Sequence, residues 1–279
     1  MKQFKHKVAV ITGGASGIGL ALARRAADEG MKLVLADIEA AALAAAAAEL
    51  SAKGAQVLTV KCDVSQGEDV ERLAGQTLKA YGGVHLVCNN AGVGGVRVKA
   101  WQASAKDWQW VLGVNVWGVI HGVRVFTPIM LGQGEAGHIV NTASAAGFVS
   151  MASTAPYAVS KHAVVTLSEV LYHDLKAENA NVGVSVLCPA WVNTNIWNSR
   201  RNRPAELVDH DDTDAERARR EEVRALLEKG KVTAADVAAM TFDAIAADRF
   251  YIFPHPKIRN DIRTRMEDIL ELRNPTRTA

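Results

Sequence analysis

The sequence predicts a doubly wound α/β fold, built as a single domain over residues 1–279. Short β-rich runs alternate strictly with helical segments, which is the order of elements in an α/β protein. The runs are continuously apolar rather than alternating, as in parallel strands covered by helices on both faces. No linker or internal repeat divides the chain. A ligand site is therefore expected at the carboxyl ends of the strands of one sheet.

Seven segments are predicted to form the strands of this sheet, at residues 8–12, 32–37, 56–63, 84–90, 138–144, 182–189 and 250–253. A capping-box pattern predicts helix starts at Ser65–Glu68, Ser104–Asp107 and Thr233–Asp236. A long helix is expected from about Pro156 to Asn179, since proline suits the first helical position.

The chain end, residues 254–279, is predicted to form a helical tail. Its apolar residues recur at helical spacing and are Ile258, Ile262, Met266, Ile269 and Leu270. We expect this stripe to pack over a substrate lid or a neighbouring subunit, and packing on the core is an equally open alternative.

Composition excludes several classes of function. The chain is 49% apolar and 22% charged, with a formal net charge of +2. These values are typical of a soluble globular protein and predict no nucleic-acid or membrane partner. The N-terminus lacks a signal-peptide core, and no run of about 18 or more apolar residues occurs. Cys62, Cys88 and Cys188 form no CxxC pair, and the histidines lack ligand spacing. We therefore expect a cytoplasmic protein without a metal site.

The segment TGGASGIG, Thr12 to Gly19, joins the first strand to the first helix. Gly13, Gly17 and Gly19 permit a tight turn and a close approach of the backbone to a pyrophosphate. The helix N-terminus adds free N–H groups and a positive dipole end. A glycine-rich turn can also join a strand to a helix without a ligand, but the strand-turn-helix context favours phosphate binding.

Asp37 ends the second strand, where a ribose-binding acid is expected. A 2′-phosphate beside it would meet a like charge, at a cost of about 4 kcal/mol at 4 Å and an effective dielectric constant near 20. Ser16 and Ile38 offer no cation to offset this repulsion. The sequence therefore predicts NAD(H) rather than NADP(H). The alternative is that Asp37 only caps the following helix.

Two tyrosine–lysine pairs lie in the long helix, in YAVSK (Tyr157, Lys161) and YHDLK (Tyr172, Lys176). The i,i+4 spacing places each pair on one helix face, where an ammonium within about 4–6 Å lowers the pKa of a phenol by about 1–3. Tyr157 lies in the first turn, after Ser144 and close to the fifth strand. Tyr172 lies about 22 Å further along the axis. Only the first pair is predicted to be catalytic, and the second is predicted to be a surface pair.

With these motifs in family order, the chain resembles the short-chain dehydrogenase/reductase family. The resemblance rests on TGGASGIG, CDV at Cys62–Val64, NNAG at Asn89–Gly92, GVNVWG around Asn115, Ser144, YAVSK, and PAWVNT at Pro189–Thr194. It implies a Rossmann-type sheet of strand order 3-2-1-4-5-6-7, a nicotinamide cofactor and a homodimer or homotetramer. It points to the NAD-preferring alcohol dehydrogenase or carbonyl reductase type.

The resemblance also implies a catalytic tetrad of Asn115, Ser144, Tyr157 and Lys161. Tyr157 would exchange a proton with the substrate oxygen, and Ser144 would stabilise charge on that oxygen. Lys161 would lower the pKa of Tyr157 and hold the nicotinamide ribose, and Asn115 would hold a relay water. The cofactor-binding residues so implied are Gly13, Ser16, Gly17, Ile18, Gly19, Asp37, Asp63, Val64, Asn90, Ala91, Gly92, Tyr157, Lys161, Pro189, Val192 and Thr194. Ala190 departs from the glycine that the family often has.

Substrate contacts are expected from loops after the fourth, fifth and sixth strands. The candidates are Val93, Ala145, Phe148, Met151, Trp191, Ile196 and Trp197, although for each a place in the core is an equal alternative. They are apolar or aromatic and include no basic group, which favours a hydrophobic secondary alcohol or ketone as substrate. Residues 198–230, with a helix expected at 215–229, are predicted to form a charged substrate lid. Arg200, Arg201 and Arg203 are expected to be solvated there, with contact to an acidic substrate as the alternative.

The sequence thus predicts an NAD(H)-dependent oxidoreductase that acts on a hydrophobic alcohol or ketone. A 3-oxoacyl thioester or a steroid-like ketone is the alternative substrate class. A cofactor-sensing protein without catalysis is a third hypothesis, which the complete tetrad disfavours.

Overall fold

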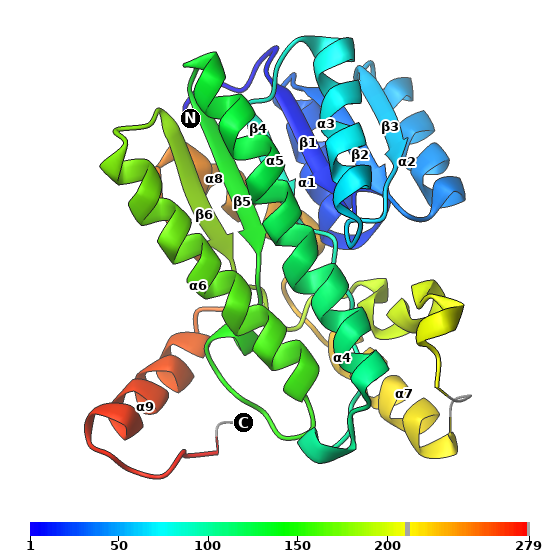
Figure 1. The fold of residues 1–279 in the computed structure, drawn as a ribbon, viewed down its shortest axis with the longest axis vertical. Helices are drawn as coiled ribbons and strands as arrows, with labels where there is room; N and C mark the ends of the chain where they lie inside the picture. The colour runs from blue at the N-terminus through cyan, green and yellow to red at the C-terminus, as the bar shows by residue number, and fades with distance from the viewer. Residues whose placement is uncertain (210–212, 278–279) are drawn as a thin grey trace.

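The computed structural model describes residues 1–209 and 213–277. Residues 210–212 of the predicted lid and 278–279 of the predicted tail lie outside the described residues. Within them, one parallel sheet has the strand order β3-β2-β1-β4-β5-β6-β7, as predicted (Figure 1). The strands are β1 (Val8–Thr12), β2 (Lys32–Asp37), β3 (Val57–Lys61), β4 (Leu86–Asn89), β5 (Gly137–Thr142), β6 (Val182–Leu187) and β7 (Tyr251–Ile252).

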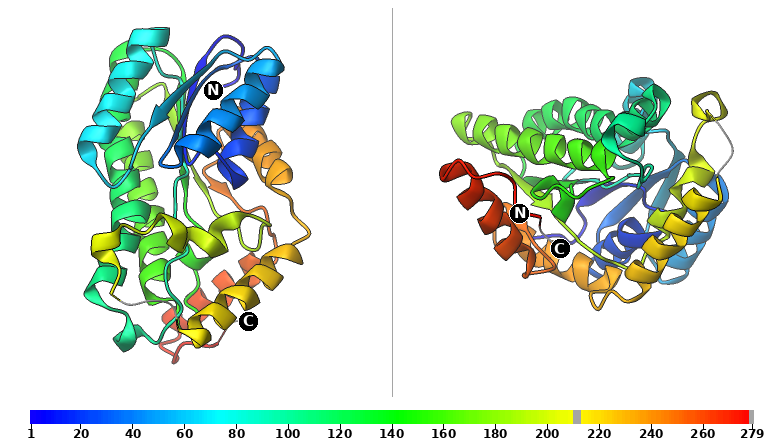
Figure 2. Two further views of the ribbon diagram at one scale, coloured as in Figure 1. Left: turned by 90° about the vertical axis from the view of Figure 1, so that its right-hand side faces the viewer. Right: turned by 90° about the horizontal axis from the view of Figure 1, so that it is seen from below.

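Helices cover both faces of the sheet. One face carries α1 (Gly17–Asp28), α2 (Ala40–Ala52) and α8 (Ala234–Ala246), and the other carries α3 (Gly67–Tyr81), α5 (Gly118–Gln133) and α6 (Ala155–Ala177). Figure 2, in its right-hand view, shows the two helical layers on either side of the sheet. Along β2, Leu33 and Leu35 enter one core and Val34 and Ala36 enter the other. Burial on both faces explains why the strand is a continuous apolar run.

All three predicted helices begin at the predicted stretches, but only two of the three capping boxes are confirmed. Ser104 caps α4 (Ala105–Leu112) in a capping box with Asp107, and Thr233 caps α8 in the same way with Asp236. The capping box predicted at Ser65–Glu68 is wrong, because α3 begins at Gly67 and its N-cap residue, Gln66, makes no side-chain bond. The Ser65 hydroxyl instead donates to the Asp63 carboxylate at 2.8 Å. This local bond competes with capping.

Several strands are shorter than predicted. β3 ends at Lys61 rather than at residue 63, because Lys61 pairs with Asp37, the last residue of β2. β7 keeps only Tyr251 and Ile252, which pair with the end of β6. Phe250 and Phe253, on either side of β7, pack against the core, so their apolar character reflects burial rather than strand pairing.

The stretch Ala105–Gln133 is continuously helical through α4, the π-helical turn η2 (Gly113–Trp117) and α5. By length and composition alone it could cross a membrane, with a mean hydropathy of 1.3 in its most apolar window. Its α5 part contacts α3, β4 and β5. The apolar residues of this stretch therefore contribute to the core of the fold.

Two further segments lie beyond the carboxyl ends of the strands (Figure 1). The first, after β6, contains η4 (Asn195–Asn202), η5 (Ala205–Leu207) and α7 (Asp214–Glu228). The second is the tail helix α9 (Ile258–Leu270), which agrees with the predicted helix. Ile258 and Ile262 pack on Ala145, Val149 and neighbouring loop residues. Only the first part of the apolar stripe is covered, since Ile269 and Leu270 are 52% and 81% exposed.

Candidate active site

One large cavity of about 1410 Å³ opens at the carboxyl ends of the strands. This exceeds the roughly 300–1,000 Å³ of an ordinary small-molecule pocket. The glycine turn and Asp37 line one end, and Tyr157 and the loop after β6 line the other. The cavity is therefore large enough for an extended ligand together with a second molecule.

The glycine turn is shaped by two left-handed residues. Gly13 and Gly17 have φ angles of +63° and +53°, which side-chain-bearing residues rarely adopt. A Cβ at Gly13 would lie 2.9 Å from the Ala91 Cα atom. Gly19 does not line the cavity among the described residues; a Cβ there would lie 2.0 Å from the Gly13 carbonyl oxygen. Gly19 therefore allows the turn to close, while Gly13, Ser16, Gly17 and Ile18 face the cavity.

Asp37 connects the end of β2 to the glycine turn. Its carboxylate accepts hydrogen bonds from the Ala15 and Glu39 backbone N–H groups, both at 3.1 Å. Burial raises the pKa of Asp37, and these hydrogen bonds oppose the rise. α2 is capped at Glu39 without a side-chain bond, so Asp37 is not its N-cap residue. A second acidic side chain, that of Glu39, lines the cavity beside it.

The end of β4 is fixed to β1 by Thr12. Its Oγ1 atom accepts from the Asn90 and Ala91 N–H groups at 2.9 and 3.1 Å, and the Asn90 amide donates to the Thr12 carbonyl at 3.0 Å. This places Asn90 and Ala91 of the NNAG motif along the cavity wall. Gly92 is also on this wall, as are Asp63 and Val64 from the loop after β3.

Tyr157, Ser144 and Lys161 meet on one wall. Tyr157 lies in the first turn of α6, close to Ser144, which caps the short helix η3 (Ala145–Gly147) after β5 and whose hydroxyl donates to the Pro189 carbonyl at 3.3 Å. The Lys161 ammonium donates to the Thr142 carbonyl at 2.9 Å and lies 5.7 Å from the centroid of the Tyr157 ring. All three residues line the cavity.

Burial dominates the acid–base properties of this wall. Burial raises the pKa of Tyr157, whereas the neighbouring Ser144 hydroxyl and the positive charge of Arg97 lower this pKa. It lowers the pKa of Lys161 to about 8. The cation that opposes the rise in the pKa of Tyr157 is thus Arg97, whereas the sequence predicts this role for Lys161. At neutral pH Tyr157 is protonated and Lys161 is mainly cationic.

Asn115 is held behind the wall by η2. Its Oδ1 atom accepts from the Val93 N–H at 2.8 Å, and its amide nitrogen donates to the Val93 carbonyl and the Ser160 hydroxyl. Asn115 is 1% exposed and does not line the cavity among the described residues. It therefore fixes the loop after β4 against α6.

Comparison with known proteins agrees with this geometry. The model of the short chain dehydrogenase family matches residues 7–205. This chain belongs to the short-chain dehydrogenase/reductase family. A 1-deoxy-11-beta-hydroxypentalenate dehydrogenase from Streptomyces exfoliatus is 38% identical over 94% of this chain and 88% of its own length. A CLA biosynthesis dehydrogenase/reductase from Lactiplantibacillus plantarum is 33% identical, over 97% and 95% respectively. A Burkholderia phymatum short chain dehydrogenase/reductase, crystallised in complex with NAD, is 52% identical over 100% of this chain and 99% of that chain, with a TM-score of 0.97.

In the present chain, six of the seven candidate substrate residues line the cavity: Val93, Ala145, Met151, Trp191, Ile196 and Trp197. Phe148 does not line it among the described residues. Its ring packs against Phe253 at 5.3 Å and Tyr251 at 6.0 Å between ring centroids. Because η3 turns the chain after Ser144, Phe148 points toward β7. Pro189, Val192 and Thr194 also line the cavity, and their contact with the cofactor stays a prediction.

The sequence did not identify two residues that shape this loop region. His255 accepts from the Ala190 N–H at 3.2 Å, and its other ring nitrogen lies 3.1 Å from the Trp191 carbonyl. Burial lowers the pKa of His255, so the neutral ring bridges the two residues. Ser199 accepts from the Gly94 N–H at 3.0 Å and so joins η4 to the loop after β4. Neither residue lies in a motif, because their partners are backbone groups distant in sequence.

The second tyrosine–lysine pair lies away from the cavity. Tyr172 packs against Phe250 at 5.2 Å between ring centroids, and Lys176 forms an ion pair with Asp248 at 3.4 Å. Neither residue lines the cavity among those described. Lys176 is a surface residue, as predicted, whereas the Tyr172 ring is partly buried on the core.

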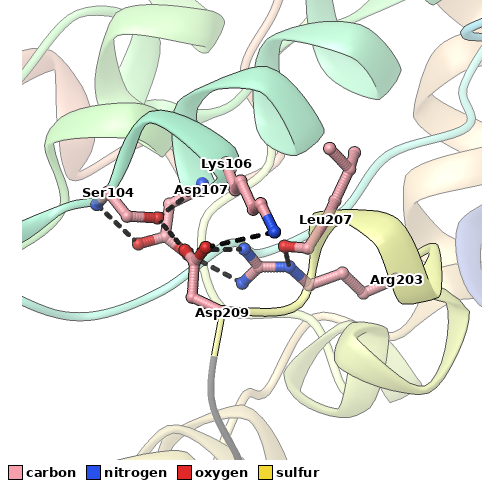
Figure 3. A network of polar contacts seen from close by, with 6 residues as sticks. All are labelled: Ser104, Lys106, Asp107, Arg203, Leu207 and Asp209. Carbon is pink, nitrogen blue, oxygen red and sulfur yellow. Dashed lines mark hydrogen bonds and ion pairs between the residues drawn. The ribbon is translucent and has the colours of Figure 1, made fainter.

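The segment after β6 is held to the rest of the molecule at two places. At the Asp37 end, Glu39 accepts from Arg201 at 2.5 Å and from Asn202 at 2.8 Å. At the α4 end, Arg203 donates to Asp107 at 2.7 Å and to the Leu207 carbonyl at 2.8 Å (Figure 3). The solvated positions predicted for these arginines are therefore wrong for Arg203, whose side chain is 2% exposed.

We expect Arg203→Met to lower the free energy of unfolding by about 3–5 kcal/mol, because it leaves the Asp107 carboxylate without its buried partner. The double variant Arg203→Met/Asp107→Asn is expected to recover part of this loss, since neither charge remains. Urea unfolding of the single and double variants measures the difference. The exposed pair of Arg124 and Glu71 supplies the control, because Arg124→Met should change stability by about 1 kcal/mol or less. A loss no larger than that of the control would contradict the expectation.

Proposed function

We propose that this chain is an NAD(H)-dependent oxidoreductase that interconverts a hydrophobic secondary alcohol and its ketone. The observation that carries the proposal is the meeting of Tyr157, Ser144 and Lys161 on one wall of the cavity that begins at the glycine turn. A protonated phenol, a hydroxyl and an ammonium in this arrangement are suited to proton exchange with a substrate oxygen.

The cavity fits a dinucleotide. The left-handed Gly13 and Gly17 leave room for a pyrophosphate at the N-terminus of α1. Asp37 places a negative charge where the adenosine ribose is expected, which disfavours a 2′-phosphate, whereas the neighbouring Glu39 is paired with Arg201. NAD(H) use is further supported by the related Burkholderia phymatum protein, which was crystallised with NAD. The residues proposed to hold the cofactor are Gly13, Ser16, Gly17, Ile18, Asp37, Asp63, Val64, Asn90, Ala91, Gly92, Tyr157, Lys161, Pro189, Val192 and Thr194.

The residues of the wall divide the chemistry between them. Tyr157, protonated at neutral pH, donates its phenolic proton to a carbonyl oxygen during reduction and takes a proton from an alcohol during oxidation. Ser144 donates a hydrogen bond to the same oxygen and stabilises its developing charge. Lys161, fixed by the Thr142 carbonyl, keeps a positive charge beside the phenol. When bound, the nicotinamide supplies or accepts the hydride that changes the oxidation state of the substrate carbon.

The segment of residues 198–230 is proposed to act as the substrate lid. It borders the cavity through Ser199, Arg219, Val223 and Leu227, and it is attached to both Glu39 and Asp107. Both attachments are made by η4 and the residue that follows it, and closure of the segment over the cavity would separate the substrate from water. The homodimer or homotetramer and the cytoplasmic location stay predictions.

Turnover with a panel of ketones and alcohols tests the proposal. With NADH, aryl and alicyclic ketones should be reduced at rates well above those with NADPH, as followed by absorbance of the reduced nicotinamide. Greater activity on 3-oxoacyl thioesters or steroid-like ketones would favour the alternative substrate class. NADH binding without turnover of any member would contradict the enzyme proposal and favour a cofactor sensor.

A further inference from the structure

The substrate half of the cavity contains a cation that the sequence did not reveal. Arg97, in the loop after β4, lines the cavity together with Tyr157 and Trp191. Its guanidinium carbon lies 6.0 Å from the centroid of the Trp191 ring. The candidate substrate residues taken from the sequence are all uncharged, so Arg97 changes the chemistry expected at this end.

Arg97 is held in place without a partner for its charge. Its backbone carbonyl accepts from Arg219 of α7 at 3.0 Å, which fixes the loop against the lid. The residue is half-buried, and within the described part of the chain its guanidinium makes no hydrogen bond or ion pair. Glu222 is near enough to interact electrostatically but is not paired with it. The N–H groups of this half-buried arginine are therefore available to water or to a ligand in the cavity.

The guanidinium of Arg97 has an aromatic neighbour. It lies over the Trp191 ring, which is a favourable contact for an arginine. Its N–H groups make no hydrogen bond within the described part of the chain, and their fork geometry matches a carboxylate. After η4, the other basic residues that line the cavity are Arg219, Arg220, Lys231 and Lys257, against the acids Glu206, Glu216 and Asp261. The charge at the substrate end therefore favours an anion.

We propose that the substrate carries a carboxylate in addition to its reacting alcohol or ketone, and that Arg97 binds this carboxylate. The inference rests on the proposed oxidoreductase function and specifies its substrate class as an apolar oxo acid or hydroxy acid. Trp191, Ile196 and Trp197 would contact the apolar body of such a molecule, while Arg97 fixes its orientation relative to Tyr157. Arg97 is in this sense a specificity-determining residue.

Pairs of phenyl keto acids and their methyl esters test the proposal, with a series of chain lengths between the carbonyl and the carboxylate. The intact protein with NADH should reduce one or more acids with a kcat/KM about 30-fold or more above that of the matching ester. Arg97→Met should remove this preference, so that the ratio of kcat/KM for the acid to that for the matching ester falls to about one. Lys99→Met is the matched control, because Lys99 lies in the same loop over the exposed Trp101 and outside the cavity. It should retain the preference.

The outcomes separate this inference from the proposed function. Equal kcat/KM values for acids and esters in the original protein would overturn the inference. An equal loss of kcat/KM for both in Arg97→Met would also overturn it, because Arg97 would then act only on Tyr157. Absence of turnover with every compound would contradict the proposed function instead. In that case, tryptophan fluorescence should still report acid binding that Arg97→Met abolishes, and an unchanged affinity in that variant would overturn the inference.

Discussion

Replacing Tyr157 by phenylalanine is expected to lower kcat by about 10²–10⁴-fold, since the variant lacks the proton donor of the wall. The ring stays in place beside Lys161 and Ser144, so NADH affinity should change little. Steady-state rates with the best ketone of the panel, together with NADH binding by fluorescence, measure the two effects separately. The circular dichroism spectrum and unfolding midpoint should remain close to those of the original protein.

Tyr172→Phe is the matched control for this experiment, because it removes the same hydroxyl from the same helix and the same sequence spacing. Tyr172 packs on Phe250 away from the cavity, so its variant should retain full turnover. Comparable losses in the two variants would mean that the hydroxyl of Tyr157 is not the proton donor, and the proposed mechanism would fail.

The second large effect concerns the choice between the two nicotinamide cofactors. Asp37→Asn removes one of the two negative charges at the ribose end while keeping the size of the side chain. A repulsion of about 4 kcal/mol corresponds to nearly a 10³-fold difference in affinity. Because Glu39 remains, we expect the ratio of kcat/KM for NADPH to that for NADH to rise by about 100-fold. Rates measured with each cofactor at a fixed ketone concentration give this ratio.

Asp63→Asn is the control for the cofactor experiment, since Asp63 also lines the cavity but follows β3. Its carboxylate already accepts from the Ser65 backbone and hydroxyl. This variant should affect both cofactors to a similar degree and leave their ratio nearly constant. A ratio that shifts equally in the two variants would assign discrimination to overall charge at this end rather than to Asp37.

Those parts of the site that depend on local chain geometry were predictable from the sequence. The glycine turn needs left-handed residues directly after a strand, and Gly13 and Gly17 occupy such positions. The spacing of Tyr157 and Lys161 follows from the helical repeat, so their shared face could be predicted. The strand order came from the family resemblance and was confirmed.

The parts that depend on contacts between distant segments were not predictable. Arg97 gains its importance only when the loop after β4 meets Trp191 of the loop after β6. Phe148 was assigned to the substrate because it follows Ser144 closely, yet η3 turns it toward Phe253. Arg203 has the composition of a solvated residue, and only the position of α4 makes it a buried partner of Asp107.

The π-helical turn also constrains how related chains can change during evolution. In η2 the Gly118 N–H bonds to the Gly113 carbonyl, so the turn contains one residue more than an α-helical turn. Deleting one residue there would regularise the helix but would rotate α4 by about 100° relative to α5. Asn115 would then lose its hydrogen bonds with Val93 and Ser160, and Asp107 would lose its ion pair with Arg203. The number of residues between α4 and α5 is therefore fixed by these contacts.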